Sequence, residues 1–344
     1  MVHTYFGIGQ YIVEDEQQGM LRADYGDKTL KGISEKLSAK FGKGYSERNL
    51  RNMRQFFLTY QERAIWQTAS AKLQTTENKD IEISQRPSSE PQIQDVPSQK
   101  FNNLSLSWSH YLILMRIENP DERSFYEIEA NNQHWSERQL QRQYNSSLYE
   151  RLALSRDKEK VMQLATEGHQ VEEPTDLLKN PLTLEFLGLS ESSVYSETDL
   201  ETAIISKLQL FLLELGKGFL FESRQKRFTF DEEHFFVDLV FYNRLLQCYV
   251  LIDLKTNKLK HQDLGQMQMY VNYYDRYVKL PNEKPTIGIL LCKEKKDTLV
   301  ELTLPHDTKI YASEYKFYLP DKQLLKQKLR EWIDEFEKRK GEEA

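Results

Sequence analysis

Two neighbouring apolar segments of this 344-residue chain carry charged residues where buried strands are expected. The first is HFFVDLVFYN, with Asp238 inside it, and the second is CYVLIDLK, with Asp253 and Lys255 near its end. β-branched and aromatic residues crowd both segments, which is typical of largely buried strands. A carboxylate buried without a partner is costly, and two on adjacent strands also repel each other. Some group must compensate them.

A divalent cation would provide that compensation. Successive side chains of a strand alternate between its faces, so Asp253 and Lys255 point the same way. If the strand with Asp238 pairs with theirs, the three groups share one end of a sheet. Mg²⁺ or Mn²⁺ takes oxygen ligands from carboxylates, water and phosphate, and an adjacent ammonium can hold or help deprotonate a water. These groups suit metal-assisted phosphodiester hydrolysis. The alternative is a solvated surface ion pair, which is what most isolated D-x-K matches are.

Hydrophobic periodicity and composition divide the chain into segments. In the first of them, the apolar residues that recur at helical spacing are Leu30, Ile33, Leu37 and Phe41. After GKG, Ser46 is expected to cap a second helix. The later stretch TTENKDIEISQRPSSEPQIQDVPSQK is typical of a flexible linker. The expected segments are a helical DNA-binding segment (1–66), the linker (67–100), a helical continuation (101–189) and an α/β domain (196–344).

The α/β segment alternates helix and strand patterns. One long helix, TDLETAIISKLQLFLLELGKGF, is expected to end at Gly216 and Gly218. Strand patterns follow in FLFESRQKRFTF, FFVDLVFY and CYVLIDLK, then a helix in QDLGQMQMYVNYYDRYV and strands in TIGILLCK and IYAS. The tail, DKQLLKQKLREWIDEFEKRK, has the pattern of an amphipathic helix. This order predicts an α/β fold with a mixed sheet.

The helix that begins after Ser46 has an apolar and a polar side. The apolar side holds Leu50, Met53, Phe57 and Tyr60, and the polar side holds Arg48, Arg51, Asn52 and Gln55. Arg, Asn and Gln side chains bond base edges and phosphates. With the preceding helix and short turn, the pattern predicts a DNA reader of helix-turn-helix or winged-helix type. A solvated outer face is the alternative.

A weak internal repeat relates two helix starts. YSERNL (45–50) and WSERQL (135–140) share an aromatic residue, Ser-Glu-Arg, an amide residue and Leu. Two related helical substructures would produce this repeat. A shared preference for Ser as the cap and Glu beside the helix dipole explains it equally well.

Bulk properties exclude several classes of protein. No apolar stretch is long enough for a membrane span, and the N-terminus has no signal-peptide pattern. Cys248 and Cys292 each lie inside an apolar segment and suit a reduced compartment, so a cytoplasmic location is expected. The net charge of −6 disfavours a protein that coats nucleic acid generally. Cys/His metal spacing, Walker A, G-x-G-x-x-G and G-x-S-x-G motifs are all missing from the sequence.

The sequence resembles a known nuclease family over nearly its whole length, apart from the linker. The Asp238…Asp253-x-Lys255 pattern resembles the PD-(D/E)XK nuclease superfamily. The segments LLELGKGF, RQKRF, FFVDLVFYNRLLQCYVLIDLK, GQMQMYVNYYDRY and PTIGILLCKEK resemble the YhcG family of PD-(D/E)XK nuclease-domain proteins. IGQYIVEDEQQG, YGDKTL, FGKGYSERNLRNMRQFF, LSWSHY, WSERQL and NPLTLEFLGL resemble that family's N-terminal domain. Asp253 stands where relatives often carry Glu, and the superfamily admits either.

The resemblance implies a restriction-endonuclease-like core and roles for its residues. Asp238 and Asp253 would bind the metal, with the Leu254 carbonyl as a further ligand, and Lys255 would serve the nucleophilic water. Superfamily members also use a Glu on the helix before the core sheet. Glu201 is the candidate for this role, although Thr198-x-x-Glu201 is also a capping-box pattern. Glu214, near the far end of that helix, is the second candidate.

Further polar residues surround this core. Gln266 and Tyr270 lie four apart on the following helix and share a face; they match the Q-x-x-x-Y motif of RecB-like nucleases, which positions the substrate strand or the Lys. Gln225 is expected to support the site or to make an ordinary hydrogen bond. Lys258, Lys260 and His261 follow the catalytic strand and would meet phosphates, although a solvated loop explains them as well.

The expected function is a Mg²⁺- or Mn²⁺-dependent DNA nuclease whose N-terminal helices target DNA. The alternative is a DNA-binding or scaffold protein with a nuclease-like fold that does not cleave. The expected partner is DNA, no membrane is involved, and a homodimer is left open.

Overall fold

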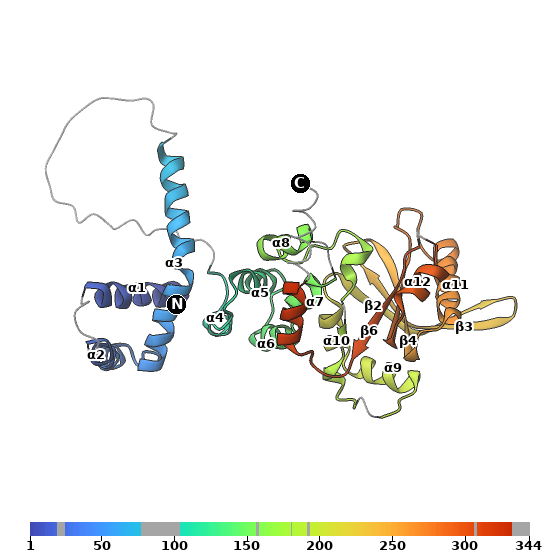
Figure 1. The fold of residues 1–344 in the computed structure, drawn as a ribbon, viewed down its shortest axis with the longest axis horizontal. Helices are drawn as coiled ribbons and strands as arrows, with labels where there is room; N and C mark the ends of the chain where they lie inside the picture. Colours follow the sequence, from blue (N-terminus) through green and yellow to red (C-terminus); the bar gives the residue numbers. More distant parts are fainter. Residues whose placement is uncertain are drawn as a thin grey trace. The chain divides into compact units, whose positions relative to one another are not determined.

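The computed structural model describes residues 1–18, 25–76, 104–155, 158–179, 181–190, 193–305 and 308–331 (Figure 1). The chain forms two compact units, Met1–Arg123 and Ser124–Ala344. Of the segment expected to be a linker, 67–76 continues a helix, and 77–100 lies outside the described residues. None of the described helices is long and apolar enough to cross a membrane.

The first unit is a helical bundle. Its described residues contain no strand, so the winged-helix form stays a prediction. The turn after α2 is held by a hydrogen bond from the Ser34 hydroxyl to the Tyr45 carbonyl (2.8 Å) and by one from the Asn49 side chain to the Gly44 carbonyl (2.5 Å). The helices are α1 (Val2–Gln18), α2 (Tyr25–Phe41), α3 (Glu47–Thr76) and α4 (Trp108–Leu114).

The apolar side of α3 forms the core of this unit. Leu50, Met53 and Tyr60 are buried as predicted. Phe56 is fully buried, whereas Phe57, expected on this side, is only half-buried and contacts the ring of Phe6 edge-on. The difference arises because α1 and α4 pack on α3 from two directions, which widens the buried side beyond a single stripe.

The second unit begins with short helices and continues into a six-stranded sheet. Ser136 caps α6 through a capping box with Gln139, and in the first unit the Asn49 N–H donates to the Ser46 hydroxyl at the start of α3. In both halves of the weak repeat, therefore, the serine caps its helix. The helical elements before the sheet are α5 (Pro120–Asn132), α6 (Glu137–Asn145), α7 (Leu148–Ala153), α8 (Lys158–Glu167), η1 (Pro174–Leu177) and η2 (Glu185–Leu187).

The sheet is mixed, as predicted. Its strand order is β1-β6-β5-β4-β3-β2, antiparallel from β2 to β4 and parallel from β4 to β1. β1 was not predicted, because two residues are too short for a periodic pattern. The strands are β1 (Leu182–Thr183), β2 (Phe219–Phe230), β3 (Glu233–Asn243), β4 (Cys248–Lys258), β5 (Ile287–Glu294) and β6 (Ile310–Lys316).

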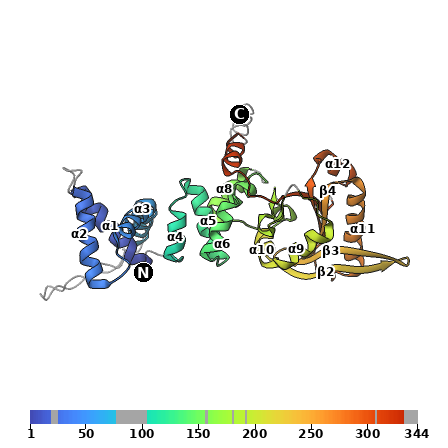
Figure 2. The same ribbon diagram turned by 90° about the horizontal axis from the view of Figure 1, so that it is seen from below.

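Helices cover both faces of the sheet (Figure 2). The single helix expected before β2 is broken at Lys207 into α9 (Glu197–Ser206) and α10 (Leu208–Leu215), which bury Leu200 and Phe211 against one face. α11 (His261–Tyr277) buries Met267 and other apolar residues against the opposite face. The short α12 (Asp297–Thr303) precedes β6, and residues 322–331 of the tail are helical as predicted.

Candidate active site

The candidate site lies where β3 and β4 separate. The two strands pair from Asn243 with Cys248 as far as Leu239 with Ile252. Asp238 and Asp253 are the next residue on each strand, directly beyond the last pair. The Leu254 N–H no longer has a strand partner on that side, and it donates to Asp238 Oδ2 (2.8 Å). The predicted juxtaposition of the two carboxylates therefore follows from the register of this antiparallel pair.

Asp253 and Lys255 form a buried ion pair within β4. The Lys255 ammonium lies 2.7 Å from Asp253 Oδ2. Burial, and then the negative charge of Asp238, raise the pKa of Asp253 to about 7 against the opposing effect of Lys255. Burial disfavours the Lys255 ammonium, but the charge of Asp253 outweighs this and raises the pKa of Lys255 above its ordinary value. The charge of Asp253 therefore favours the protonated form of Lys255.

Gln225 connects the acid pair to the helix before the sheet. Its backbone has a φ of 45°, and neither it nor Asp238 takes part in the β2–β3 ladder. The Gln225 amide nitrogen donates to Asp238 Oδ1 (3.0 Å) and also to the Glu201 carboxylate. A single side-chain amide therefore holds two carboxylates together. The sequence analysis considered a supporting role for Gln225, but nothing in the sequence indicates this left-handed conformation.

Glu201 lies at the site and is not a helix cap. The capping box of α9 is formed by Ser196 and Asp199, so the capping interpretation of Glu201 is wrong. Glu201 is 3% exposed, and Arg224 lies 3.9 Å away. Burial raises the pKa of Glu201, the hydrogen bond from Gln225 opposes that shift, and the charge of Asp238 adds to it.

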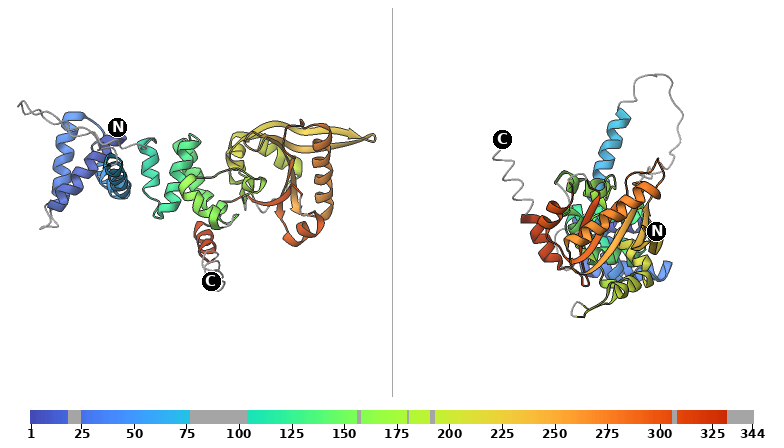
Figure 3. Two further views of the ribbon diagram at one scale, coloured as in Figure 1. Left: turned by 90° about the horizontal axis from the view of Figure 1, so that it is seen from above. Right: turned by 90° about the vertical axis from the view of Figure 1, so that its right-hand side faces the viewer.

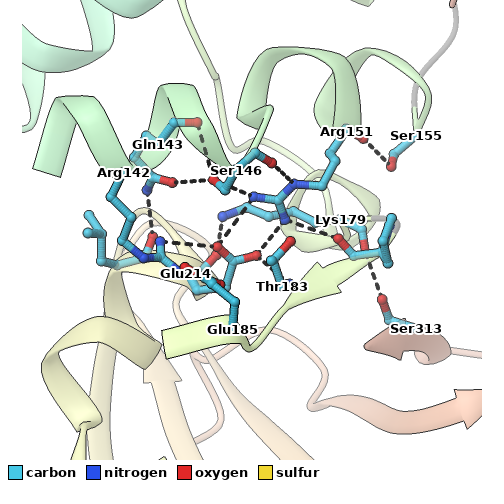
Figure 4. Close-up of polar contacts among 12 residues, drawn as sticks. Arg142, Gln143, Ser146, Arg151, Ser155, Lys179, Thr183, Glu185, Glu214 and Ser313 are labelled. Atoms are coloured by element: carbon cyan, nitrogen blue, oxygen red, sulfur yellow. Dashed lines mark hydrogen bonds and ion pairs between the residues drawn. The ribbon is translucent and has the colours of Figure 1, made fainter. Parts of the chain in front are cut away.

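Glu214 has a different environment. It lies near the end of α10, fully buried, and its carboxylate pairs with Arg151 (2.5 Å) and accepts the Thr183 N–H (2.9 Å) (Figure 4). Arg142 lies 3.4 Å from the same carboxylate, and the Lys179 ammonium donates to the Glu214 backbone carbonyl. The positive charges around Glu214 already compensate it, so it is not available as a metal ligand.

The predicted pair on α11 is close in space. The Gln266 side-chain amide donates to the Tyr270 hydroxyl. Tyr270 is 1% exposed, and burial together with the charge of Asp253 raises the pKa of Tyr270 to about 12. The Tyr270 ring also meets Phe228 edge-on, with centroids 5.6 Å apart, three residues along β2 from the Gln225 that donates to Asp238.

An excess of acidic groups makes the site suitable for a divalent cation. Asp253 Oδ2 is a buried acceptor whose short contact with Lys255 is not aligned as a hydrogen bond. The N–H and C=O of one strand residue point to the same side, so the Leu254 carbonyl should face the gap beside Asp238.

No group of three or more His, Cys, Asp and Glu side chains among the described residues is close enough for a full protein cage. Mg²⁺ and Mn²⁺ do not need one, because they commonly keep water and phosphate ligands. The acidic side chains here are Asp238, Asp253, Glu197 and Glu201, and the cationic ones are Lys255 and Arg224.

Glu197 is a residue that the sequence analysis missed. Its carboxylate, at the first residue of α9, lies 3.5 Å from the Lys255 ammonium and is 45% exposed. An exposed glutamate in a first helical turn looks like an ordinary response to the helix dipole, so no sequence signal distinguishes it.

The residues predicted to bind nucleic acid lie in two separate places. On α3, Arg48, Arg51 and Gln55 are exposed and Asn52 is half-buried; Arg51 lies 3.7 Å from Glu47. After β4, Lys258 pairs with Glu294 (2.6 Å), which already offsets its charge. Lys260 and His261 are exposed at the start of α11.

The fold and this site define a PD-(D/E)XK nuclease domain, with a mixed sheet between helices and an Asp…Asp-x-Lys group where two of its strands separate. Two family models match the chain: the YhcG PDDEXK nuclease domain over residues 175–330 and the DUF1016 N-terminal domain over residues 1–151. The Escherichia coli (strain K12) protein named "Putative nuclease YhcG" is 40% identical over 331 residues, which is 96% of this chain and 86% of that protein. The chain belongs to the YhcG family of PD-(D/E)XK nuclease-domain proteins.

Two solved structures show weaker likenesses. A repair endonuclease from Pyrococcus abyssi is 17% identical, with a TM-score of 0.26 over 38% of this chain and 50% of that one. EndoMS in a complex with double-stranded DNA is 15% identical, with a TM-score of 0.26 over 39% of this chain and 50% of that one. These scores are too low to support a functional inference.

Proposed function

We propose that this protein is a metal-dependent nuclease that hydrolyses phosphodiester bonds in DNA. The observation that supports this most directly is the position of Asp238, Asp253 and Lys255, gathered where β3 and β4 separate. Hydrogen bonds to Asp238 and the Lys255 ammonium beside Asp253 hold these carboxylates in place, and a divalent cation would relieve the repulsion that remains between them. The YhcG nuclease-domain match over residues 175–330 agrees with this chemistry.

The acidic groups would hold the metal and the lysine would act on water or phosphate. Asp238, Asp253 and the Leu254 carbonyl are the proposed ligands, with Glu201 held beside them by Gln225. Bound Mg²⁺ or Mn²⁺ would neutralise phosphate charge and lower the pKa of a bound water. Lys255 would act as a hydrogen-bond donor that orients the water or stabilises the phosphate, because the charge of Asp253 keeps its ammonium protonated.

The remaining predicted residues would handle the nucleic acid. Gln266 and Tyr270 would position the substrate strand or Lys255. The exposed side of α3 would bind DNA through Arg48 and its neighbours, and Lys260 would contact a phosphate near the site. Recognition by α3 would bring the nuclease domain to its substrate.

A cleavage assay on linear, branched and single-stranded DNA with Mg²⁺ or Mn²⁺ tests the proposal. We expect metal-dependent cutting, and we expect Asp253→Ala to reduce it to background. Gln225→Ala should lower activity by roughly 10- to 100-fold, as is typical for partners of metal ligands. Gln262→Ala, which changes an exposed glutamine at the start of α11, is the matched control and should cut like the unmodified protein.

Two results would contradict the proposal: no cutting of any substrate, or equal cutting by Asp253→Ala. A scaffold that does not cleave would bind DNA without metal-dependent turnover, and Mg²⁺ would barely change its melting temperature.

A further inference from the structure

A groove of about 370 Å³ lies between the end of β2 and α11. The β2–β3 hairpin extends past α11 at this point (Figure 3). The floor of the groove is aromatic. Phe228 is 6% exposed and stacks on Tyr273, with ring centroids 4.0 Å apart and an angle of 17° between the rings. Phe230 and Tyr277, also in the lining, are 54% and 66% exposed. The groove therefore presents large ring surfaces to solvent.

Polar groups complete the lining. Asn272 and Arg276, on α11, are both exposed. The Gln268 amide, also in the lining, donates to Asn272 Oδ1 (3.1 Å), which orients the Asn272 side chain. The groove thus combines aromatic faces with an amide, which can bond base edges, and a guanidinium, which can bond phosphate.

A chain of contacts connects the groove to the candidate active site. The Phe228 ring meets Tyr270 edge-on, with centroids 5.6 Å apart, and the Tyr270 hydroxyl accepts from Gln266. Phe230, the exposed ring of β2, follows Gln225 by five residues, which is roughly 17 Å along a strand. This span is about five nucleotide steps of a stacked strand, at ~3.4 Å each.

We propose that the groove binds an unpaired base of the DNA strand whose phosphodiester bond lies at Asp238 and Asp253. The proposal rests on the proposed function and specifies its substrate class: DNA with a single-stranded segment close to the cut. Aromatic faces stack on bases of any identity, but a base inside a duplex already has stacking partners on both sides and cannot enter. The exposed rings of Phe230 and Tyr277 would be the stacking surfaces.

Binding of a short single-stranded oligonucleotide, measured by fluorescence anisotropy in EDTA, tests the groove without cleavage. We expect Phe230→Ala and Tyr277→Ala each to weaken this binding roughly 5- to 100-fold, the range for losing one stacked base. Both side chains are more than half exposed, so folding should be unaffected, and Phe230→Trp and Tyr277→Phe should retain binding. Leu220→Ala, on the same strand and equally exposed at 54%, is the matched control. Binding of a blunt duplex should not change in any variant.

A fluorescent base analogue, moved along the oligonucleotide one position at a time, adds a second measurement. Its emission should change at one or two positions in the unmodified protein and not in Phe230→Ala. Single-strand binding that is equal in both alanine variants and the unmodified protein would overturn the groove proposal, whatever the cleavage assay shows. A dimer that Phe230→Ala dissociates would also overturn it, because a second copy would then cover the groove. A positional signal in a protein that cuts no DNA would support the groove and refute the nuclease function.

Discussion

Asp253 and Glu214 are both buried carboxylates, yet their pKa values shift in opposite directions. Burial raises the pKa of each group. At Asp253 the nearby charge of Asp238 adds to that rise, and the pKa reaches about 7. At Glu214 the charges of Arg151, Lys179 and Arg142 outweigh burial and lower the pKa to about 2. The first environment retains an excess of negative charge that a cation can relieve, whereas the second is already compensated and connects α7 to the nuclease domain.

The low pKa of Glu214 predicts acid sensitivity of the fold. A carboxylate whose folded pKa is depressed adds stability that is fully present above its unfolded pKa of 4.5 and is lost as the pH falls towards 2. The shift corresponds to roughly 3 kcal/mol for this fully buried group. Glu214→Gln should lose about this much free energy of unfolding at pH 7, because Arg151 loses its charged partner. As the pH falls from 5 to 3, the free energy of unfolding of Glu214→Gln should also decrease less than that of the unmodified protein. Urea titrations at several pH values measure both effects.

The control for this prediction is Glu294→Gln. Glu294 is exposed and its pKa is also lowered, through its hydrogen bond and ion pair with Lys258. Solvent screens such pairs, so no measurable change in stability is expected. An equal acid-dependent loss in Glu214→Gln and the unmodified protein would show that Glu214 does not carry this stability.

At the scale of elements, the close packing of α1 on α3 depends on one glycine. A side-chain carbon added at Gly9 would overlap the Met53 carbonyl of α3, whereas one added at Gly7, two residues earlier on α1, would meet nothing within 4 Å. The two glycines of FGIGQ are therefore not equivalent. The first lies in open space, and the second allows two helix backbones to approach.

This difference predicts opposite effects of one substitution. Gly9→Ala should destabilise the N-terminal unit by about 1–3 kcal/mol, because α1 must move away from α3. Gly7→Ala should stabilise it by up to about 1 kcal/mol, since alanine is the better helix former. Thermal melting followed by circular dichroism compares the two variants. If Gly9→Ala is as stable as Gly7→Ala, α1 does not pack this closely on α3.

At the scale of the whole molecule, the proposed DNA-binding side of α3 and the acid pair belong to different compact units. The guanidinium groups of Arg48 and Arg51 are exposed in the first unit, and Asp238 and Asp253 are held by the sheet of the second. No side chain is shared between these two groups. Targeting and cutting should therefore be separable by mutation.

The double variant Arg48→Ala/Arg51→Ala should weaken DNA binding and flatten its salt dependence. If both residues contact phosphates, the slope of log K against log salt should fall by about 1.8 in magnitude. Metal affinity, measured by thermal shift with Mg²⁺, should stay unchanged. Lys328→Ala/Arg330→Ala removes the same charge from exposed positions near the C-terminus and is the matched control. If the slope stays the same in the α3 variant, α3 contributes to folding or partner contact instead.

Local pattern alone was enough to predict the main strands and the acid pair. The apolar segments around Asp238 and Asp253 are strongly β-forming, and antiparallel pairing of adjacent segments is the simplest connection between them. The order of helix and strands therefore followed from residues close together in the chain. The identity of the charged groups was evident because acids inside apolar strands are unusual.

Contacts between residues distant in sequence decided the helix break before the sheet and the surroundings of the other site residues. The break at Lys207, the left-handed Gln225 and its bridge between Glu201 and Asp238 depend on how α9 meets the sheet. Glu201 and Glu214 lie on adjacent helices, each directly after a leucine, and only the tertiary structure connects one to Asp238 through Gln225 and places the other beside Arg151. Sequence determines what a side chain can do, but the charge environment of a buried acid is set by the residues that folding brings around it.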